Sequence, residues 1–111
     1  MADRIRIAGG SLYLDARLYE RWFADVQTVV LLGDPRSLLL VPVAHAPAGG
    51  LLVKVRNARG DRVVHAPEAL AGRGLPEDLE GEFPVAWDER AAALRINLTV
   101  APSGVETTDT R

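Results

Sequence analysis

Alternation of polar and apolar positions is the main signal along the chain. Arginine and isoleucine alternate over 4–7, the Gly9-Gly10 pair interrupts the run, and apolar positions resume over 12–14. This pattern predicts two short strands joined by a turn, because alternate side chains of a strand point to opposite faces. Runs of this kind recur and predict strands over 4–7, 12–14, 28–32, 38–43, 53–56, 62–65, 82–87 and 92–98.

Two short helices are predicted between these strands. Asp15 can cap a helix over 16–23, because a carboxylate at that position accepts hydrogen bonds from the amides of the first turn. The apolar residues of this segment fall on one side, so the helix should lie on a sheet. Pro67 begins a second helix over 67–71, since a first helical position does not need the N–H that proline lacks.

The order of these elements indicates one domain with an internal duplication. A chain of 111 residues can bury a core without a metal or a disulfide. We predict a single barrel domain over 1–101, in which repeat one covers about 4–43 and repeat two about 52–98. A connector rich in proline, alanine and glycine covers 44–51. The last segment, 102–111, has too little apolar surface to order and is expected to be a mobile tail.

Each half has the same order of strand, turn, strand, short helix and hairpin. The alignment of the halves matches 4–6 with 54–56, 12–14 with 63–65, and 38–43 with 93–98. Repetition of one unit usually means that neither copy buries its apolar face alone, so we expect the copies to interlock. The alternative is that any β-rich chain divides into similar halves.

Composition restricts the location and the partners of the protein. The chain has no cysteine, which fits a reducing compartment, and its charged N-terminus is unlike a signal peptide. No apolar stretch reaches the length of a membrane-spanning helix. We therefore expect a cytoplasmic protein without membrane contact. The net charge is −2, so any contact with DNA must come from a local basic patch.

The stretch VRNARGDRVVHAPEAL, residues 55–70, resembles the AbrB-type swapped-hairpin domain. In that family a basic residue on the first strand is followed by a turn ending in glycine, an arginine-led strand and a proline-led helix. Arg56 takes the place of the strand arginine and Gly60 that of the turn glycine. Arg62 then heads the next strand, and Pro67 begins the helix.

Two such units in one chain resemble the MraZ branch of this family, whereas AbrB and MazE proteins build the same barrel from two chains. The resemblance implies a mainly β fold with two short helices, arranged as a double-repeat swapped-hairpin barrel with pseudo-twofold symmetry. It also implies DNA binding, as a transcriptional regulator or an antitoxin-type module.

Basic residues gather in the elements that would contact DNA. Lys54 and Arg56 alternate along the predicted first strand of the second repeat and so share a face, while Arg59 and Arg62 flank the turn. Paired strands and turns contact phosphates and bases through such residues. The candidate DNA-binding residues are Arg4, Arg6, Lys54, Arg56, Arg59 and Arg62. In the competing interpretation they are solvated and form weak ion pairs with neighbours such as Asp61.

Two features favour a different function for the same barrel. Asp61 adds a carboxylate to the basic turn, and the Gly9-Gly10 turn of the first repeat carries no charge. The hairpin Val29–Val43 is apolar along both arms, so both of its faces should be covered, by this domain or by a partner. The alternative is therefore a non-DNA-binding interaction or assembly subunit of a larger complex, with a protein partner on Val29–Val43. Self-association of the chain stays open.

No set of residues in the sequence indicates catalysis. His45 and His65 are the two histidines, and without cysteine a zinc site would need at least two carboxylates as well. The serines lie outside any nucleophile motif, and the glycine pairs lack the features of a phosphate loop. We expect no metal, no cofactor and no enzymatic activity. A small enzyme would require titratable residues that converge in the fold.

Overall fold

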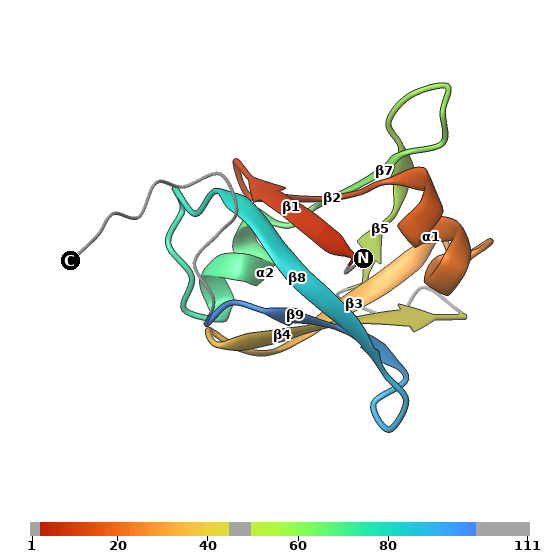
Figure 1. The fold of residues 1–111 in the computed structure, drawn as a ribbon. Coiled ribbons are helices and arrows are strands. Elements are labelled where there is room, and N and C mark those ends of the chain that lie inside the picture. The colour runs from red at the N-terminus through yellow and green to blue at the C-terminus, as the bar shows by residue number, and fades with distance from the viewer. Residues whose placement is uncertain (1–2, 45–49, 100–111) are drawn as a thin grey trace.

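The computed structural model describes residues 3–44 and 50–99. In chain order its elements are β1 (Arg4–Ala8), β2 (Ser11–Leu14), α1 (Ala16–Phe23), β3 (Thr28–Asp34), β4 (Ser37–Val43), β5 (Leu51–Leu52), β6 (Lys54–Val55), β7 (Arg62–His65), α2 (Pro67–Gly72), β8 (Gly81–Asp88) and β9 (Ala93–Asn97). The fold is mainly β with two short helices, as the sequence predicts (Figure 1).

The strands form an antiparallel sheet that curls into a nearly closed barrel (Figure 1). Their order across the sheet is β5-β3-β4-β9-β8-β1-β2-β7-β6. The two end strands are neighbours in sequence. Leu51 of β5 lies opposite Val29 of β3, whereas Lys54 of β6 lies opposite Val63 of β7. The segment 51–55 therefore pairs first with one edge of the sheet and then with the other, and this brings the two edges together.

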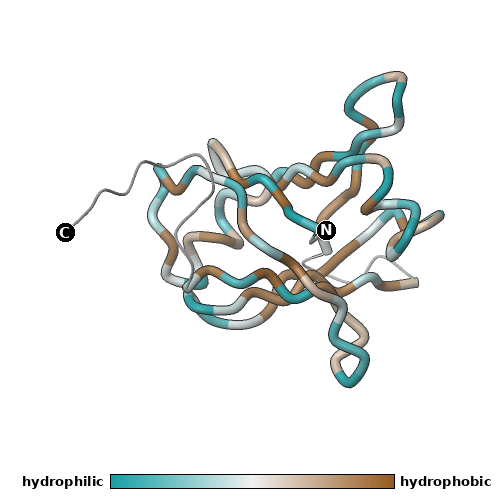
Figure 2. Tube along the Cα trace, in the orientation of Figure 1, coloured by the Kyte–Doolittle hydropathy of each residue, from teal (hydrophilic) through white to brown (hydrophobic). Residues whose placement is uncertain are grey.

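The inner faces of the strands meet in one aliphatic core. Along β1, Ile5 and Ile7 are buried while Arg4 and Arg6 are exposed, which is the predicted alternation. The turns that project from the barrel, including the long loop between β6 and β7, are mostly hydrophilic (Figures 1 and 2). The most deeply buried large side chains are Phe23, Phe83, Ile5, Ile7, Leu12, Leu14, Leu38, Leu40, Leu94, Ile96, Val29 and Val64.

Both helices begin at the predicted residues. The Leu18 N–H donates to the Asp15 carboxylate at 2.8 Å, so Asp15 caps α1. Pro67 is the first residue of α2 and leaves no unpaired amide there. Leu18 of α1 and Leu70 of α2 reach the core, which places both helices against the barrel. Within residues 3–44 and 50–99, no helix has the length and apolar character needed to cross a membrane.

The bounds of two predicted segments are wrong. The predicted connector 44–51 includes Leu51, which belongs to β5. The predicted strand 53–56 is reduced to Lys54–Val55. The Val53 N–H donates to the Gln27 carbonyl at 2.9 Å, next to β3, and the Arg56 N–H donates to the Asp61 carbonyl at 2.8 Å at the base of the turn. The predicted mobile tail 102–111 lies outside the described residues.

The β3–β4 hairpin is covered on one face by the domain itself. The inward residues of the two strands, Val29, Leu31, Leu38 and Leu40, are buried in the barrel core. On the outward face Val30 lies opposite Val41 and Leu32 opposite Leu39. These residues are half-buried except Leu32, which is 42% exposed. A partner on this hairpin would therefore meet one face.

Candidate nucleic-acid interface

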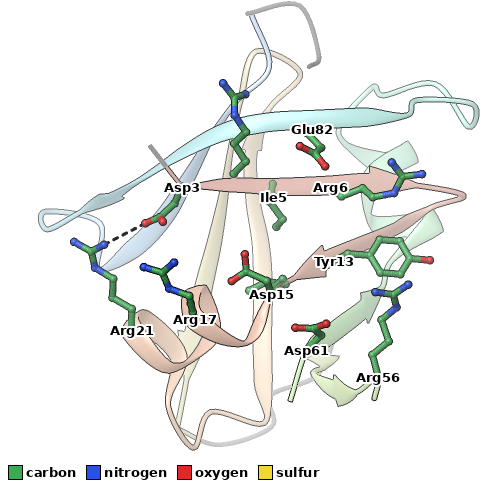
Figure 3. Close-up of a pocket in the computed structure, with 12 residues that line it drawn as sticks. Asp3, Ile5, Arg6, Tyr13, Asp15, Arg17, Arg21, Arg56, Asp61 and Glu82 are labelled. Carbon is green, nitrogen blue, oxygen red and sulfur yellow. Dashed lines mark hydrogen bonds and ion pairs between the residues drawn. The ribbon is translucent and has the colours of Figure 1, made fainter. Parts of the chain in front are cut away.

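Five arginines line a groove between β1, α1 and the loop that joins β6 to β7 (Figure 3). The groove has a volume of about 510 Å³. Its arginines are Arg4 and Arg6 from β1, Arg17 and Arg21 from α1, and Arg56 from the loop. We refer to it as the arginine groove.

Local structure explains why these side chains meet. Burial of Ile5 in the core leaves Arg4 and Arg6, on either side of it, on the outer face of β1. Arg17 and Arg21 are four residues apart in α1, so they lie on the same face of that helix.

Tyr13 of β2 lies between two of the groove arginines. The Arg56 guanidinium is 4.8 Å from the centroid of the Tyr13 ring, which is a cation–π contact. Arg6 lies on the β1 side of the same ring in Figure 3 and pairs with Glu80 at 3.2 Å. Stacking on Tyr13 thus holds Arg56 at the rim of the groove.

The groove arginines differ in their partners. Arg21 pairs with Asp3 at 3.4 Å, and its guanidinium lies 5.0 Å from the centroid of the Trp22 ring. Arg4, Arg17 and Arg56 form no ion pair with any residue of 3–44 or 50–99. A guanidinium is always charged and carries five N–H donors. These three side chains are therefore available to an anionic ligand.

Four carboxylates also line the groove and moderate its charge, namely Asp3, Asp15, Asp61 and Glu82. Asp3 is paired with Arg21, and Asp15 caps α1. Glu82 is exposed and forms no ion pair within the described residues, so its charge faces the groove unpaired. Five arginines and four carboxylates make the groove only slightly positive. Affinity for a polyanion would therefore rest on the arginines that lack an ion pair, and it should fall with added salt according to the number of phosphates they contact.

Asp61 organises the loop that carries Arg56. Its buried carboxylate accepts hydrogen bonds from Asn57 Nδ2 at 2.9 Å, from Arg59 at 2.9 and 3.3 Å, and from the Ala16 N–H at 2.8 Å. These bonds, of which that from Asn57 has the largest effect, lower the pKa of Asp61 to about 2. Asp61 is thus ionised at neutral pH and ties the β6–β7 loop to the first residue of α1.

The structure gathers only some of the predicted DNA-binding residues. Arg4, Arg6 and Arg56 line the arginine groove. Arg59 lies in the same loop as Arg56, paired with Asp61 as the sequence indicates, and its side chain is 78% exposed. Lys54, which the sequence places on the same strand face as Arg56, does not line the groove with it.

Lys54 and Arg62 instead line a second cavity, of about 400 Å³. The Arg62 guanidinium lies 4.0 Å from the centroid of the Tyr19 ring and donates to the Gly60 carbonyl at 2.8 Å. Tyr19 is a buried residue of α1, so Arg62 joins β7 to that helix. Its contacts are those of a structural residue.

Two groove residues, Arg17 and Arg21, were not among the sequence candidates. The signal that would have found them is their spacing of four residues on the polar side of the predicted helix 16–23. Sequence alone assigns such a pair to a solvated face. Only the packing of α1 beside β1 brings them to the same groove as Arg4 and Arg6.

Catalytic or metal chemistry has little support in the described residues. Ser11 Oγ lies 3.0 Å from His65 Nδ1 across the β2–β7 pair, but Ser11 is only 7% exposed. We interpret this contact as a hydrogen bond between strands, since a nucleophile must reach its substrate. Within 3–44 and 50–99, no three of the histidine, aspartate and glutamate side chains cluster as metal ligands would.

Comparison of the chain with protein-family models, with curated proteins and with solved structures gave no match.

Proposed function

We propose that this barrel is a DNA-binding module of the AbrB/MraZ kind, acting as a transcriptional regulator or an antitoxin-type protein. The observation that carries the proposal is the arginine groove, where Arg4, Arg17 and Arg56 line one cavity and form no ion pair within the described residues. Guanidinium groups bind phosphate oxygens through paired N–H donors, and such contacts supply most of the affinity for a DNA backbone. The groove is the local basic patch that a chain of net charge −2 needs.

The strand order supports the duplicated barrel on which the resemblance rests. Exchanging β1 with the joined β5–β6 segment, β2 with β7, β3 with β8 and β4 with β9 leaves every strand beside the same neighbours. The central pairs β2–β7 and β4–β9 then map onto themselves. A twofold axis that relates the two halves would produce the same exchange of strands.

The inward faces of the central pairs agree with this relation. Buried Leu12 lies opposite buried Val64 in the β2–β7 pair, and buried Leu38 lies opposite buried Ile96 in the β4–β9 pair. The first residues of the two helices, Ala16 and Pro67, follow β2 and β7 at similar distances along the chain.

Contacts between the halves follow this pattern as well. The turn of the second half reaches α1, where Asp61 accepts the Ala16 N–H. The turn of the first half reaches α2, where a Cβ placed on Gly10 would lie 2.8 Å from the Cβ of Pro67. Each turn therefore packs on the first residue of the helix in the other half, as interlocked copies require.

A second candidate function is the assembly subunit, and exposed apolar side chains favour it. Leu32, Leu52 and Val55 are 42%, 58% and 65% exposed, and Leu52 and Val55 lie close together in the segment 51–55. Exposed large apolar groups that lie together mark protein contacts. A partner would therefore cover 51–55 as well as the outward face of the β3–β4 hairpin.

A salt titration separates the two functions. Labelled duplex fragments are titrated with the protein, and anisotropy is followed at several salt concentrations. The DNA-binding function predicts that affinity falls steeply with salt and that Arg17→Ala lowers the slope of log affinity against log salt by about one. Arg36→Ala, in the β3–β4 turn outside the groove, is the matched control and should leave the slope unchanged. Absence of binding at low salt would exclude DNA and leave the assembly function.

A further inference from the structure

The arginines that α1 and the β6–β7 loop supply to the groove have no basic counterpart in the other half of the barrel. Ala16 and Pro67, the first residues of the two helices, are 51 positions apart. With this shift Arg17 corresponds to Glu68 and Arg21 to Gly72.

The loop arginine, Arg56, also lacks a counterpart. Arg56 lies in the six-residue segment 56–61 between β6 and β7, whereas the matching turn between β1 and β2 is the two-residue Gly9-Gly10. The second half therefore lacks the loop arginine, and Glu68 carries a negative charge where α1 has Arg17.

Consequently, we propose that the module takes one phosphodiester backbone per chain, in the arginine groove alone, and that the other half of the barrel makes no equivalent contact. This inference rests on the proposed DNA binding and deepens it. A twofold arrangement of contacts suits a palindromic site, since protein symmetry matches the symmetry of the DNA. A barrel with a single groove instead contacts DNA through one half only, so one chain does not need a palindromic site.

The structure offers a pair of variants that test the charge difference directly. Glu68 and Gly72 are exposed on α2 with the spacing of Arg17 and Arg21 on α1. A Cβ on Gly72 meets no atom within 4 Å, so a side chain fits there. The double variant E68R/G72R copies the arginine pair of α1 onto α2, and R17E/R21E removes it from α1. Arg36→Glu is the control for a charge change outside the groove.

The experiment is calorimetry of the full chain with a short oligothymidylate, which presents a single backbone without sequence information, and with a duplex of the same length. Calorimetry gives the number of oligonucleotides bound per chain whether or not the chain self-associates. We expect one oligothymidylate per wild-type chain, a second and weaker binding event in E68R/G72R, and at least a tenfold loss of affinity in R17E/R21E.

The other results separate failure of the single-groove inference from failure of the proposed DNA binding. Two oligonucleotides per wild-type chain, unchanged affinity in R17E/R21E, or no additional binding in E68R/G72R would overturn the single-groove inference while DNA binding stands. Binding of the duplex without binding of the oligothymidylate would overturn it too. If neither oligonucleotide binds at low salt, the proposed function itself fails.

Discussion

The carboxylate of Asp61 accepts the backbone N–H of Ala16 at 2.8 Å, although the two residues are 45 positions apart in the chain. Ala16 begins α1, and Asp61 ends the loop that carries Arg56 and Arg59. A negative charge at a helix N-terminus is favourable because the amides there lack partners within the helix. One buried carboxylate thus fixes the loop of one half against the helix of the other, and both contribute arginines to the groove.

This contact makes stability depend on pH in the acid range. Because the folded-state pKa of Asp61 is lowered from 3.8 to about 2, its contribution is fully present above about pH 4 and is lost as pH falls toward 2. Asp61→Ala should therefore lower the melting temperature at pH 6, and its difference from the wild type should shrink as pH falls from 4 to 2. Glu89→Ala, in the exposed β8–β9 turn, is the control. An Asp61→Ala deficit that is constant with pH would show that the carboxylate charge does not stabilise the fold.

Under the proposed DNA binding, we expect Asp61 to act differently from what its sequence position indicates. As a like charge in a basic turn it would repel phosphate, but its carboxylate is buried and fully hydrogen-bonded. Removal of Asp61 should therefore disorder the loop and weaken binding.

Glu82 is the carboxylate whose removal should strengthen binding. It lines the groove, it is exposed, and it lies opposite Arg6 across the β1–β8 pair. Glu82→Gln removes its repulsion of phosphate and keeps its shape, so the affinity for duplex DNA at low salt should rise several-fold. Anisotropy measures this change, with Glu89→Gln as the matched control. A weaker or unchanged Glu82→Gln would show that the ligand does not approach this wall of the groove.

Trp22 and Trp87 report on the packing of α1 against β8. Their rings are stacked with centroids 4.9 Å apart and an angle of 1° between the planes. Two indoles in this geometry should couple and produce a paired positive and negative band in circular dichroism. Either Trp22→Phe or Trp87→Phe should remove the pair of bands while the protein stays folded. A wild-type spectrum that equals the sum of two isolated tryptophans would contradict the stacking.

The core should tolerate truncation much less than the outward face of the β3–β4 hairpin. Leu40 and Ile96 are fully buried, whereas Leu32 is 42% exposed. Leu40→Ala and Ile96→Ala should each lower the free energy of unfolding by ~2–5 kcal/mol, because a cavity remains where the side chain was. Leu32→Ala serves as the comparison in chemical denaturation and should cost less than ~1 kcal/mol. Equal losses at Leu32 and Leu40 would show that the inward face is assigned to the wrong residues.

Local patterns in the sequence predicted the elements well, because each has a local cause. The Asp15 cap and the first-turn proline Pro67 place the helix starts correctly. The strand 53–56 was predicted too long because its pairing partner changes at Val53, and partners are not visible in a local pattern. Leu39 illustrates the same limit: it lies in a fully apolar run, yet only its neighbours Leu38 and Leu40 face the core.

The candidate site was predictable only in part. Arg4, Arg6 and Arg56 lie in strand and turn segments that the family resemblance marks, so sequence could select them. Lys54 and Arg62 belong to the same segments but line a different cavity, where Arg62 stacks on Tyr19. Arg17 and Arg21 enter the groove through the packing of α1 beside β1, which no local signal records.

The most direct test of the arginine groove is a two-dimensional ¹H–¹⁵N NMR titration of the full chain with a short DNA duplex at low salt. DNA binding in the groove predicts the largest shifts at the backbone amides of 4–7, 17–21 and 56–61, with little change along the β3–β4 hairpin and α2. Shifts centred on α2 or on that hairpin, or an unchanged spectrum, would contradict the claim that the groove binds DNA.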